Sequence, residues 1–426
     1  MNPPLASDLD QEVGASAKTG RLRRRRPRSG RRWWKRGPFR IAGALFLMFV
    51  LWLCWSLGGY LTAPGGDSFA ARLAEWARDH HLGAIVTVLE SAPSTAPTPQ
   101  VGGTPTIALK PPGVAAAPQA PAAPATSTAT PTVSTAATPT PSIPATSAPP
   151  YVYPARLVSP AGVPLPNEGT WQTLGRVGGV PALVGTYLRP DAAHTSSVAS
   201  VVSMDPKLLR YELHPGTSDP GGSNWGTPPS IPPGSRNGLL ATFNGGFKVS
   251  QSGGGFFLNG VTRGTLTPNI ASLVFHKDGH VAVGLWGRDV GMSPDVVGVR
   301  QNLHLLVDRS TVSGAVDSHV QSTWGLTIGG KDFVWRSGIG VTADGRIVFV
   351  YGSALSPRTL ADLLHQAGCV EAMQLDINPA WMSFQYYTPA PDPANPTPTA
   401  LLSAQVRPAN RYYEPTSRDF VAVFAR

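Results

Sequence analysis

A carboxylate stands where a strand is expected to end, in the stretch AMQLDINPAWMSF of residues 372–384. The apolar run before it predicts a strand over residues 371–375, and Asp376 follows directly, two residues ahead of Asn378. A side chain at the carboxyl end of a strand is well placed to enter a ligand site. The alternative is local, because an Asp before Asn-Pro often accepts hydrogen bonds from its own turn. Asp376 is therefore the first candidate for chemistry.

The same residues raise the question of a metal. Asp376 and Asn378 are oxygen ligands at the i, i+2 spacing of calcium loops, but two ligands are too few for an ion that takes six to eight. His80 and His81 are adjacent, so on a helix their side chains point in different directions, and no third ligand is in view. We predict no metal site and no cofactor, and leave open a divalent cation such as calcium at Asp376.

A second catalytic carboxylate is not distinguished by its position in the chain. Glu212, Asp289 and Asp308 are all available in or beside expected strands, and His214 precedes a Pro-Gly turn. The separation between two carboxylates, which decides between inverting and retaining chemistry, depends on the fold.

One helix and one strand are expected to position Asp376. In SPRTLADLLHQAGC, residues 356–369, Ser356 can cap a helix, Pro357 fits its first turn and Gly368 stops it. Leucines at helical spacing give this helix an apolar face. A helix packed behind a sheet would thus return the chain so that Asp376 emerges at a strand's carboxyl end.

The rest of this region is rich in expected strands. Residues 271–287 and 338–352 both form hairpin patterns, around a Lys-Asp-Gly turn and an Asp-Gly turn. We therefore expect the α+β fold class, a mixed or antiparallel β-rich domain with few helices, over residues 151–426. Cys369 is the only cysteine in this domain, and the other, Cys54, lies in the apolar segment, so no intrachain disulfide is expected within the domain.

The positive charge of the chain is concentrated before this domain. Residues 1–40 hold 12 Lys and Arg against 3 acidic residues, which accounts for +9 of the net charge of +10. The domain is nearly neutral, so a nucleic-acid surface on it is not expected. Residues 41–63 are uncharged and long enough to span a bilayer, and the basic flank predicts a cytoplasmic tail over 1–40 and an extracytoplasmic C-terminal domain. A cleaved signal sequence is the alternative.

Two segments connect the apolar stretch to the domain. Residues 64–90 have apolar side chains at helical spacing and predict an amphipathic helix outside the membrane. Residues 91–150 hold 15 prolines and are otherwise mostly Ala, Thr and Ser, which predicts a disordered, semi-rigid linker. The expected organisation is a domain tethered to the cell membrane by a single helix and a Pro/Thr/Ala-rich stalk.

Four motifs in order resemble the phosphodiester glycosidase family. They are TFNGGF at 242–247, WRSGIGVTADGRIVFVYG at 335–352, SPRTLADLLHQAG at 356–368 and AMQLDINPAWMSF at 372–384. The resemblance implies a mixed α+β domain that removes a sugar from a sugar-phosphate diester, as the family's uncovering enzyme does, and a glycan substrate on the cell surface.

The resemblance also implies site residues. The family's strand-end carboxylate matches Asp376, and its Arg before a small-Ile-Gly sequence matches Arg336. We expect Asp376 to stabilise or attack the anomeric carbon and Arg336 to hold the phosphodiester oxygens in a bidentate pair. Asn244, Gly245, Gly246 and Asn378 are the expected substrate-binding residues, since glycines let backbone N–H groups approach an anion.

The chain departs from the family directly after Asp376. Most members have Asp-Gly-Gly-Gly-Ser where this chain has Asp-Ile-Asn-Pro-Ala, which changes the floor of the pocket and removes a donor at Pro379. Two functions are therefore predicted. The first is a membrane-anchored extracytoplasmic hydrolase acting on sugar-phosphate diesters of surface glycans, and the alternative is a non-catalytic glycan-binding or scaffold module of the same fold.

Overall fold

A computed structural model describes part of the chain. The described residues are 37–62, 69, 72–73, 76–77, 80, 99–105, 151–318, 320–327 and 330–426. Contacts divide the chain into two compact units, Met1–Ser56 and Leu57–Arg426. The predicted basic tail up to residue 36, and most of the predicted helix at 64–90 and linker at 91–150, lie outside the described residues.

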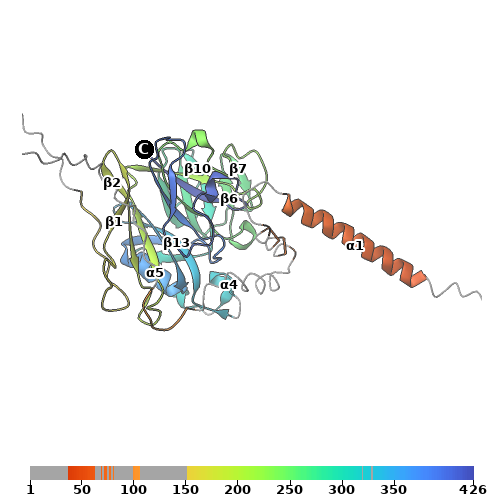
Figure 1. Cartoon of the computed structure of the whole chain (residues 1–426), viewed down its shortest axis with the longest axis horizontal. Helices are drawn as coiled ribbons and strands as arrows, with labels where there is room; N and C mark the ends of the chain where they lie inside the picture. The colour runs from red at the N-terminus through yellow and green to blue at the C-terminus, as the bar shows by residue number, and fades with distance from the viewer. Residues whose placement is uncertain are drawn as a thin grey trace, which may run out of the picture. The chain divides into compact units, whose positions relative to one another are not determined.

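The apolar segment forms one long helix, α1, Gly37–Leu61 (Figure 1). Within it, Ile41–Leu61 has a mean hydropathy of 2.1 and is long and apolar enough to cross a membrane, the only such helix in the described ranges. A signal sequence near the N-terminus also meets these criteria of length and composition. The helix is thus confirmed, and its role as an anchor stays a prediction.

The second unit contains three antiparallel sheets, which confirms the β-rich α+β class. The largest sheet has the strand order β1 (Gln172–Val177), β2 (Val180–Leu188), β3 (Ala199–Met204), β14 (Ile347–Leu355), β13 (Val334–Thr342), β15 (Cys369–Gln374), β11 (Leu305–Asp308) and β12 (Thr311–Val312). The second has the order β7 (Val261–Arg263), β6 (Phe256–Leu258), β10 (Val296–Gln301), β8 (Ala271–His276) and β9 (Val281–Leu285). The third has the order β17 (Thr397–Ala400), β16 (Phe384–Thr388), β5 (Leu239–Asn244), β18 (Phe420–Ala425) and β4 (Leu209–His214). Both predicted hairpins, β8–β9 and β13–β14, are present.

Strand β14 shows how the core is built. Its side chains alternate between the two faces of the sheet, as the pleat requires. Phe349 and Tyr351 join a core shared with the other two sheets, and Val348 and Val350 join a second core on the opposite face. Because both faces are covered, the first four residues of the strand, Ile347–Val350, are all apolar rather than alternating with polar residues.

The second core contains the main helix of the domain, α5 (Pro357–Gln366), beside β13 in Figure 1. Ser356 and Thr359 form a capping box in which each side chain accepts a hydrogen bond from the other's backbone N–H. Gly368 ends the helix with a φ of 91°, a left-handed conformation that favours glycine. The predicted order of helix, glycine and strand is confirmed. The other described helices are short: α4 (Gln321–Trp324) and the 3-10 turns η1 (Pro233–Ser235), η2 (Val249–Gln251), η3 (Gly314–Asp317) and η5 (Arg411–Tyr413).

Candidate active site

Asp376 lies two residues after the end of β15 and has only 3 % of its surface exposed. Its backbone pairs with Ser337 of β13: the Ser337 N–H donates to the Asp376 carbonyl at 2.9 Å, and the Asp376 N–H donates to the Ser337 hydroxyl at 3.2 Å. Its Oδ1 accepts from the N–H groups of Ile377 and Asn378 at 2.7 and 2.9 Å. The turn that was the local alternative for Asp376 is therefore present, and it engages one carboxylate oxygen.

The other carboxylate oxygen of Asp376 faces Arg418, which the sequence patterns did not single out. Oδ2 lies 3.7 Å from Nη2 of Arg418, and that nitrogen donates to the Gly246 carbonyl at 3.0 Å. Nε of the same guanidinium lies 3.8 Å from Oδ2 of Asp219. One buried guanidinium therefore lies between two carboxylates, beside the Gly245–Gly246 turn.

A second arginine–aspartate pair adjoins this group. Arg300 Nε donates to Oδ2 of Asp419 at 2.8 Å, and neither side chain is more than 1 % exposed. The Arg300 guanidinium also donates to the backbone carbonyls of Phe247 and Gln301. The carbonyl of Asp419 accepts from the Gly245 N–H at 3.0 Å, so this ion pair holds the glycine turn. Such a buried pair is costly to break, since either partner alone is an uncompensated charge.

The two glycines are needed for close packing. A Cβ at Gly245 would lie 2.0 Å from Oδ2 of Asp419, and a Cβ at Gly246 would lie 3.0 Å from Oδ1 of Asn302. Asn302 in turn donates to the Gln374 carbonyl at the end of β15 at 2.7 Å. The turn that was predicted to bind substrate is therefore packed against a carboxylate and an amide of the protein itself.

Asn244 connects three segments at the end of β5. Its Nδ2 donates to the Gly245 carbonyl at 2.8 Å and to the Ser337 hydroxyl at 3.0 Å. Its Oδ1 accepts from the Ser383 N–H at 3.2 Å. Ser337, which Asn244 contacts, also bonds the Asp376 backbone, so Asn244 is linked to Asp376 through one residue. These bonds engage both ends of the Asn244 amide within the protein.

Arg336 lies in different surroundings. It is 2 % exposed, and its guanidinium donates to the carbonyls of Leu355 (2.9 Å), Trp324 (3.2 Å) and Asp332 (3.2 Å) and to Oε1 of Gln374 (2.9 Å). Burial lowers the pKa of Arg336 to about 10. The structure thus brings Arg336 to the end of β15 through Gln374, and its hydrogen bonds go to neutral acceptors rather than to the Asp376 carboxylate.

Asn378 caps the turn that follows Asp376. Its Oδ1 accepts from the Ala380 N–H at 3.0 Å, and its carbonyl accepts from the N–H groups of Trp381 and Met382 at 2.9 and 3.1 Å. The residue is half-buried. It therefore shapes the Ile-Asn-Pro-Ala segment that replaces the family's glycines.

Asp219 is the carboxylate whose protonation the surroundings shift. Burial raises the pKa of Asp219, against opposing effects of Arg418 and Arg300, and the neighbouring Asp419 raises it further. Both of its oxygens accept from the Val249 N–H at 3.2 Å. Asp219 therefore keeps its proton to a higher pH than an ordinary aspartate.

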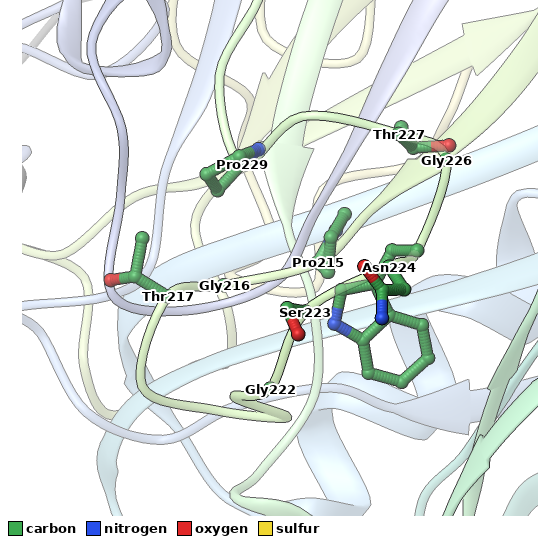
Figure 2. Close-up of a pocket in the computed structure, with 10 residues that line it drawn as sticks. Pro215, Gly216, Thr217, Gly222, Ser223, Asn224, Gly226, Thr227 and Pro229 are labelled. Carbon is green, nitrogen blue, oxygen red and sulfur yellow. The ribbon is translucent and has the colours of Figure 1, made fainter.

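A cavity of about 490 Å³ is lined by the loop between β4 and η1, and Figure 2 shows residues of this loop. The volume is in the range of small-ligand sites. Its lining residues are Pro215, Gly216, Thr217, Gly222, Ser223, Asn224, Trp225, Gly226, Thr227 and Pro229. Asp219 lies in the same loop, and its N–H donates to the Ser417 carbonyl at 2.9 Å, beside Arg418. The loop therefore joins a cavity with hydroxyl, amide and indole groups to the Arg418 cluster.

The other carboxylates considered from sequence have partners elsewhere. Asp289 and Asp308 both pair with Arg288, at 2.6 and 2.7 Å. Glu212 pairs with Arg210 and lies 3.7 Å from Nε2 of His214. Among the residues that the structure describes, no three His, Cys, Asp or Glu side chains group as metal ligands would.

The residues that sequence analysis missed lie in two irregular segments. Asp219 follows β4 within a Gly/Pro-rich loop, and Arg418 and Asp419 immediately precede β18. An Arg-Asp pair before an apolar run is a weak signal in a single sequence. The signal that the sequence does contain is the position of this charged pair directly ahead of the apolar run of β18.

Comparison with known proteins agrees with the motifs. Residues 237–376 match the family model described as phosphodiester glycosidase. No curated protein matches the chain. Among solved structures, the catalytic domain of zebrafish N-acetylglucosamine-1-phosphodiester alpha-N-acetylglucosaminidase, auto-inhibited by its pro-peptide, is 13% identical with a TM-score of 0.37, covering 60% of this chain and 87% of that one. A hypothetical protein from Synechocystis is 12% identical with a TM-score of 0.31, covering 58% of this chain and 63% of that one.

The matched region covers most of the predicted site residues. It includes Asn244, Gly245, Gly246 and Arg336, and it ends at Asp376, whereas Asp219 and Arg418 lie outside it. Residues 237–376 are thus similar to the phosphodiester glycosidase family, in agreement with the motifs at 242–247, 335–352 and 356–368.

Proposed function

We propose that this chain is a membrane-tethered, extracytoplasmic hydrolase that cleaves a sugar from a sugar-phosphate diester on cell-surface glycans. The observation that carries the proposal is the position of Arg418, between Asp376 and Asp219 in a domain similar to the phosphodiester glycosidase family. The cavity lined by the Asp219 loop has the volume for a sugar, and Asp219 connects this loop with Arg418. The apolar helix α1 and the basic residues before it support the tether and the orientation.

The proposed roles follow from the charges. A phosphodiester carries one negative charge, and the Arg418 guanidinium offers the planar donors that suit its two free oxygens. Cleavage at the anomeric carbon develops positive charge on the sugar, which the Asp376 carboxylate can stabilise or attack. Asp219, whose pKa burial raises, is the candidate to hold a proton near the departing phosphate.

In this proposal the other predicted residues hold the reacting groups in place. Arg336 fixes Gln374, the last residue of β15, and so the place where Asp376 leaves the sheet. Asn244 bonds Ser337, which holds the Asp376 backbone. In this proposal the substrate phosphate binds Arg418, and Arg336, Asn244, Gly245, Gly246 and Asn378 shape the wall around it.

One observation favours the non-catalytic alternative. Asp376 is almost completely buried and Oδ1 is engaged by its own turn, as a purely architectural aspartate would be. A glycan-binding module with the same cavity would need no reactive carboxylate. Turnover distinguishes the two functions.

The test is hydrolysis of a panel of N-acetylglucosamine phosphodiesters by the full chain in detergent. Asn at position 376 can still accept the two turn hydrogen bonds, so Asp376→Asn should fold normally and lower kcat/KM by about a hundredfold or more. Arg309→Gln, a change at an exposed arginine paired weakly with Asp289, is the matched control and should retain full activity. Circular dichroism checks the fold of each variant. Turnover that survives Asp376→Asn would remove this residue from the mechanism, and no turnover by the wild type would favour the binding module.

A further inference from the structure

A second cavity, of about 250 Å³, lies in the loop that leads to Arg418. Its lining residues are Arg407, Pro408, Asn410, Arg411, Glu414, Pro415 and Thr416. Two arginines therefore face one glutamate around a space large enough for a small anion. None of these residues was selected from the sequence, and the proposed hydrolysis does not use them.

The Arg411 guanidinium is held in a fixed orientation. It donates to the Trp381 carbonyl and to the Thr416 hydroxyl, both at 3.3 Å. Both acceptors are neutral, a carbonyl and a hydroxyl. Its guanidinium is thus held at the cavity by neutral acceptors, with Glu414 as the one acidic residue among those that line it, and this fixed orientation lowers the entropic cost of binding an anion.

Trp381 connects this cavity with the candidate active site. The guanidinium carbons of Arg407, Arg411 and Arg418 lie 4.7, 5.5 and 5.5 Å from the centre of the indole ring. These are cation–π distances. The guanidinium carbons of Arg411 and Arg418 are therefore at most twice 5.5 Å apart. One sugar or polyol unit between two phosphates can span this distance.

The two cavities are also neighbours along the backbone. Thr416 lines the second cavity, and its carbonyl accepts from the N–H of Thr217, which lines the first, at 2.9 Å. The Thr416 N–H donates to the carbonyl of Pro229, another residue of the first cavity, at 3.0 Å. A chain-like ligand in the first cavity would therefore pass close to the second.

We propose that the cavity lined by Arg407 and Arg411 is a second phosphate subsite, which binds the neighbouring phosphodiester of a polymeric substrate while Arg418 binds the reacting one. This inference rests on the proposed function, since it takes a phosphodiester as the reacting group. It specifies the substrate class as a polymer with repeated sugar-phosphate or polyol-phosphate units. A single capped sugar phosphate would leave the second subsite empty.

Binding measurements with the full chain in detergent at fixed ionic strength test this subsite. The probes are poly(glycerol phosphate), a polyuronate of matched length and a short N-acetylglucosamine phosphodiester. Arg411→Gln should weaken binding of poly(glycerol phosphate) about tenfold and leave the affinity for the short diester unchanged. Arg309→Gln, at an arginine 68 % exposed and outside both cavities, should change neither affinity.

A second variant in the same cavity should change the polymer affinity in the opposite direction, so the test does not depend on whether Arg411→Gln folds. Glu414 is exposed and lines the same cavity, so Glu414→Gln should strengthen polymer binding about two- to threefold by removing a repulsive charge. Unchanged polymer affinity in both variants, or equal loss for polymer and short diester, would overturn the subsite. So would equal binding of the polyuronate, because the site is assigned to phosphate. If the protein hydrolyses diesters but Arg411→Gln does not weaken polymer binding, the subsite is excluded and the hydrolase stands. If Arg411→Gln weakens polymer binding but the protein hydrolyses no diester, the hydrolase is excluded and the subsite stands.

Discussion

Arg336 and Arg418 are both buried arginines near the end of β15, but their partners differ. Arg336 donates to three carbonyls and one amide oxygen, all neutral acceptors within the protein. Arg418 lies between Asp376 and Asp219, and the loop that contains Asp219 also lines a cavity. An arginine surrounded by carbonyls stabilises the strands around it. An arginine between carboxylates belongs to a charged group in which an anionic substrate can replace one of the acidic neighbours.

Loss of a fully buried ion pair should give the largest effect in this region. Arg300→Met leaves Asp419 charged with almost no access to water, so we expect the free energy of unfolding to fall by about 3–5 kcal/mol. Denaturant titration measures this change. The exposed control Arg309→Gln should stay within about 0.5 kcal/mol of the wild type. A loss below about 1 kcal/mol for Arg300→Met would mean that the pair is not buried as described.

Arg418→Gln should affect activity more than stability. Removing the guanidinium takes away the donors for the phosphodiester oxygens, and kcat/KM should fall by about a hundredfold, or about 2.7 kcal/mol. The melting temperature should fall less than in Arg300→Met, because the carboxylates lie 3.7 and 3.8 Å from the Arg418 guanidinium, whereas Arg300 contacts Asp419 at 2.8 Å. Steady-state kinetics and thermal denaturation check both parts. Activity within threefold of the wild type would exclude Arg418 as the phosphate ligand.

Arg336→Gln should affect stability more than activity. Several buried carbonyls lose their donor, so the free energy of unfolding should fall by about 1–3 kcal/mol. In the folded fraction, hydrolysis should be reduced by less than in Arg418→Gln, because Arg336 acts only through Gln374. Parallel denaturation and kinetics on the two variants make the comparison. If the Arg336→Gln protein is stable but has no turnover, Arg336 would instead be assigned a direct contact with substrate.

The smallest expected effect is a pH dependence from Asp219. Burial raises the pKa of this carboxyl, so it stays protonated, and the Arg418 group carries one negative charge fewer, up to that raised pKa. KM for the phosphodiester should therefore increase as the pH rises through the raised pKa, by about tenfold or less. The contribution of Asp219 to folding stability has the same sign: it is present at low pH and is lost as the pH rises. In Asp219→Asn, which cannot ionise, this part of the profile should be flat, and a persistent slope would assign it to another group.

Local patterns were sufficient for much of the fold. The helix α5 with its capping box, the strand β15 after it and the two hairpins follow from periodicity, caps and turn residues that act over a few positions. The apolar helix α1 follows from length and composition alone. The order of the strands in three sheets was not predictable in this way, because pairing between β14 and β3, for example, depends on contacts far apart in the chain.

The sequence by itself thus determined the β-rich class, the apolar helix, the similarity to the phosphodiester glycosidase family and the position of Asp376 after a strand. Only the tertiary structure decided which cation faces that carboxylate. Arg418 and Asp219 lie in irregular loops and meet because their segments form a backbone bridge next to the glycine turn. Burial then decided the chemistry available to each charge: it surrounds Arg336 with neutral acceptors and raises the pKa of Asp219. Desolvation depends on how the whole domain packs, so no short stretch of sequence encodes it.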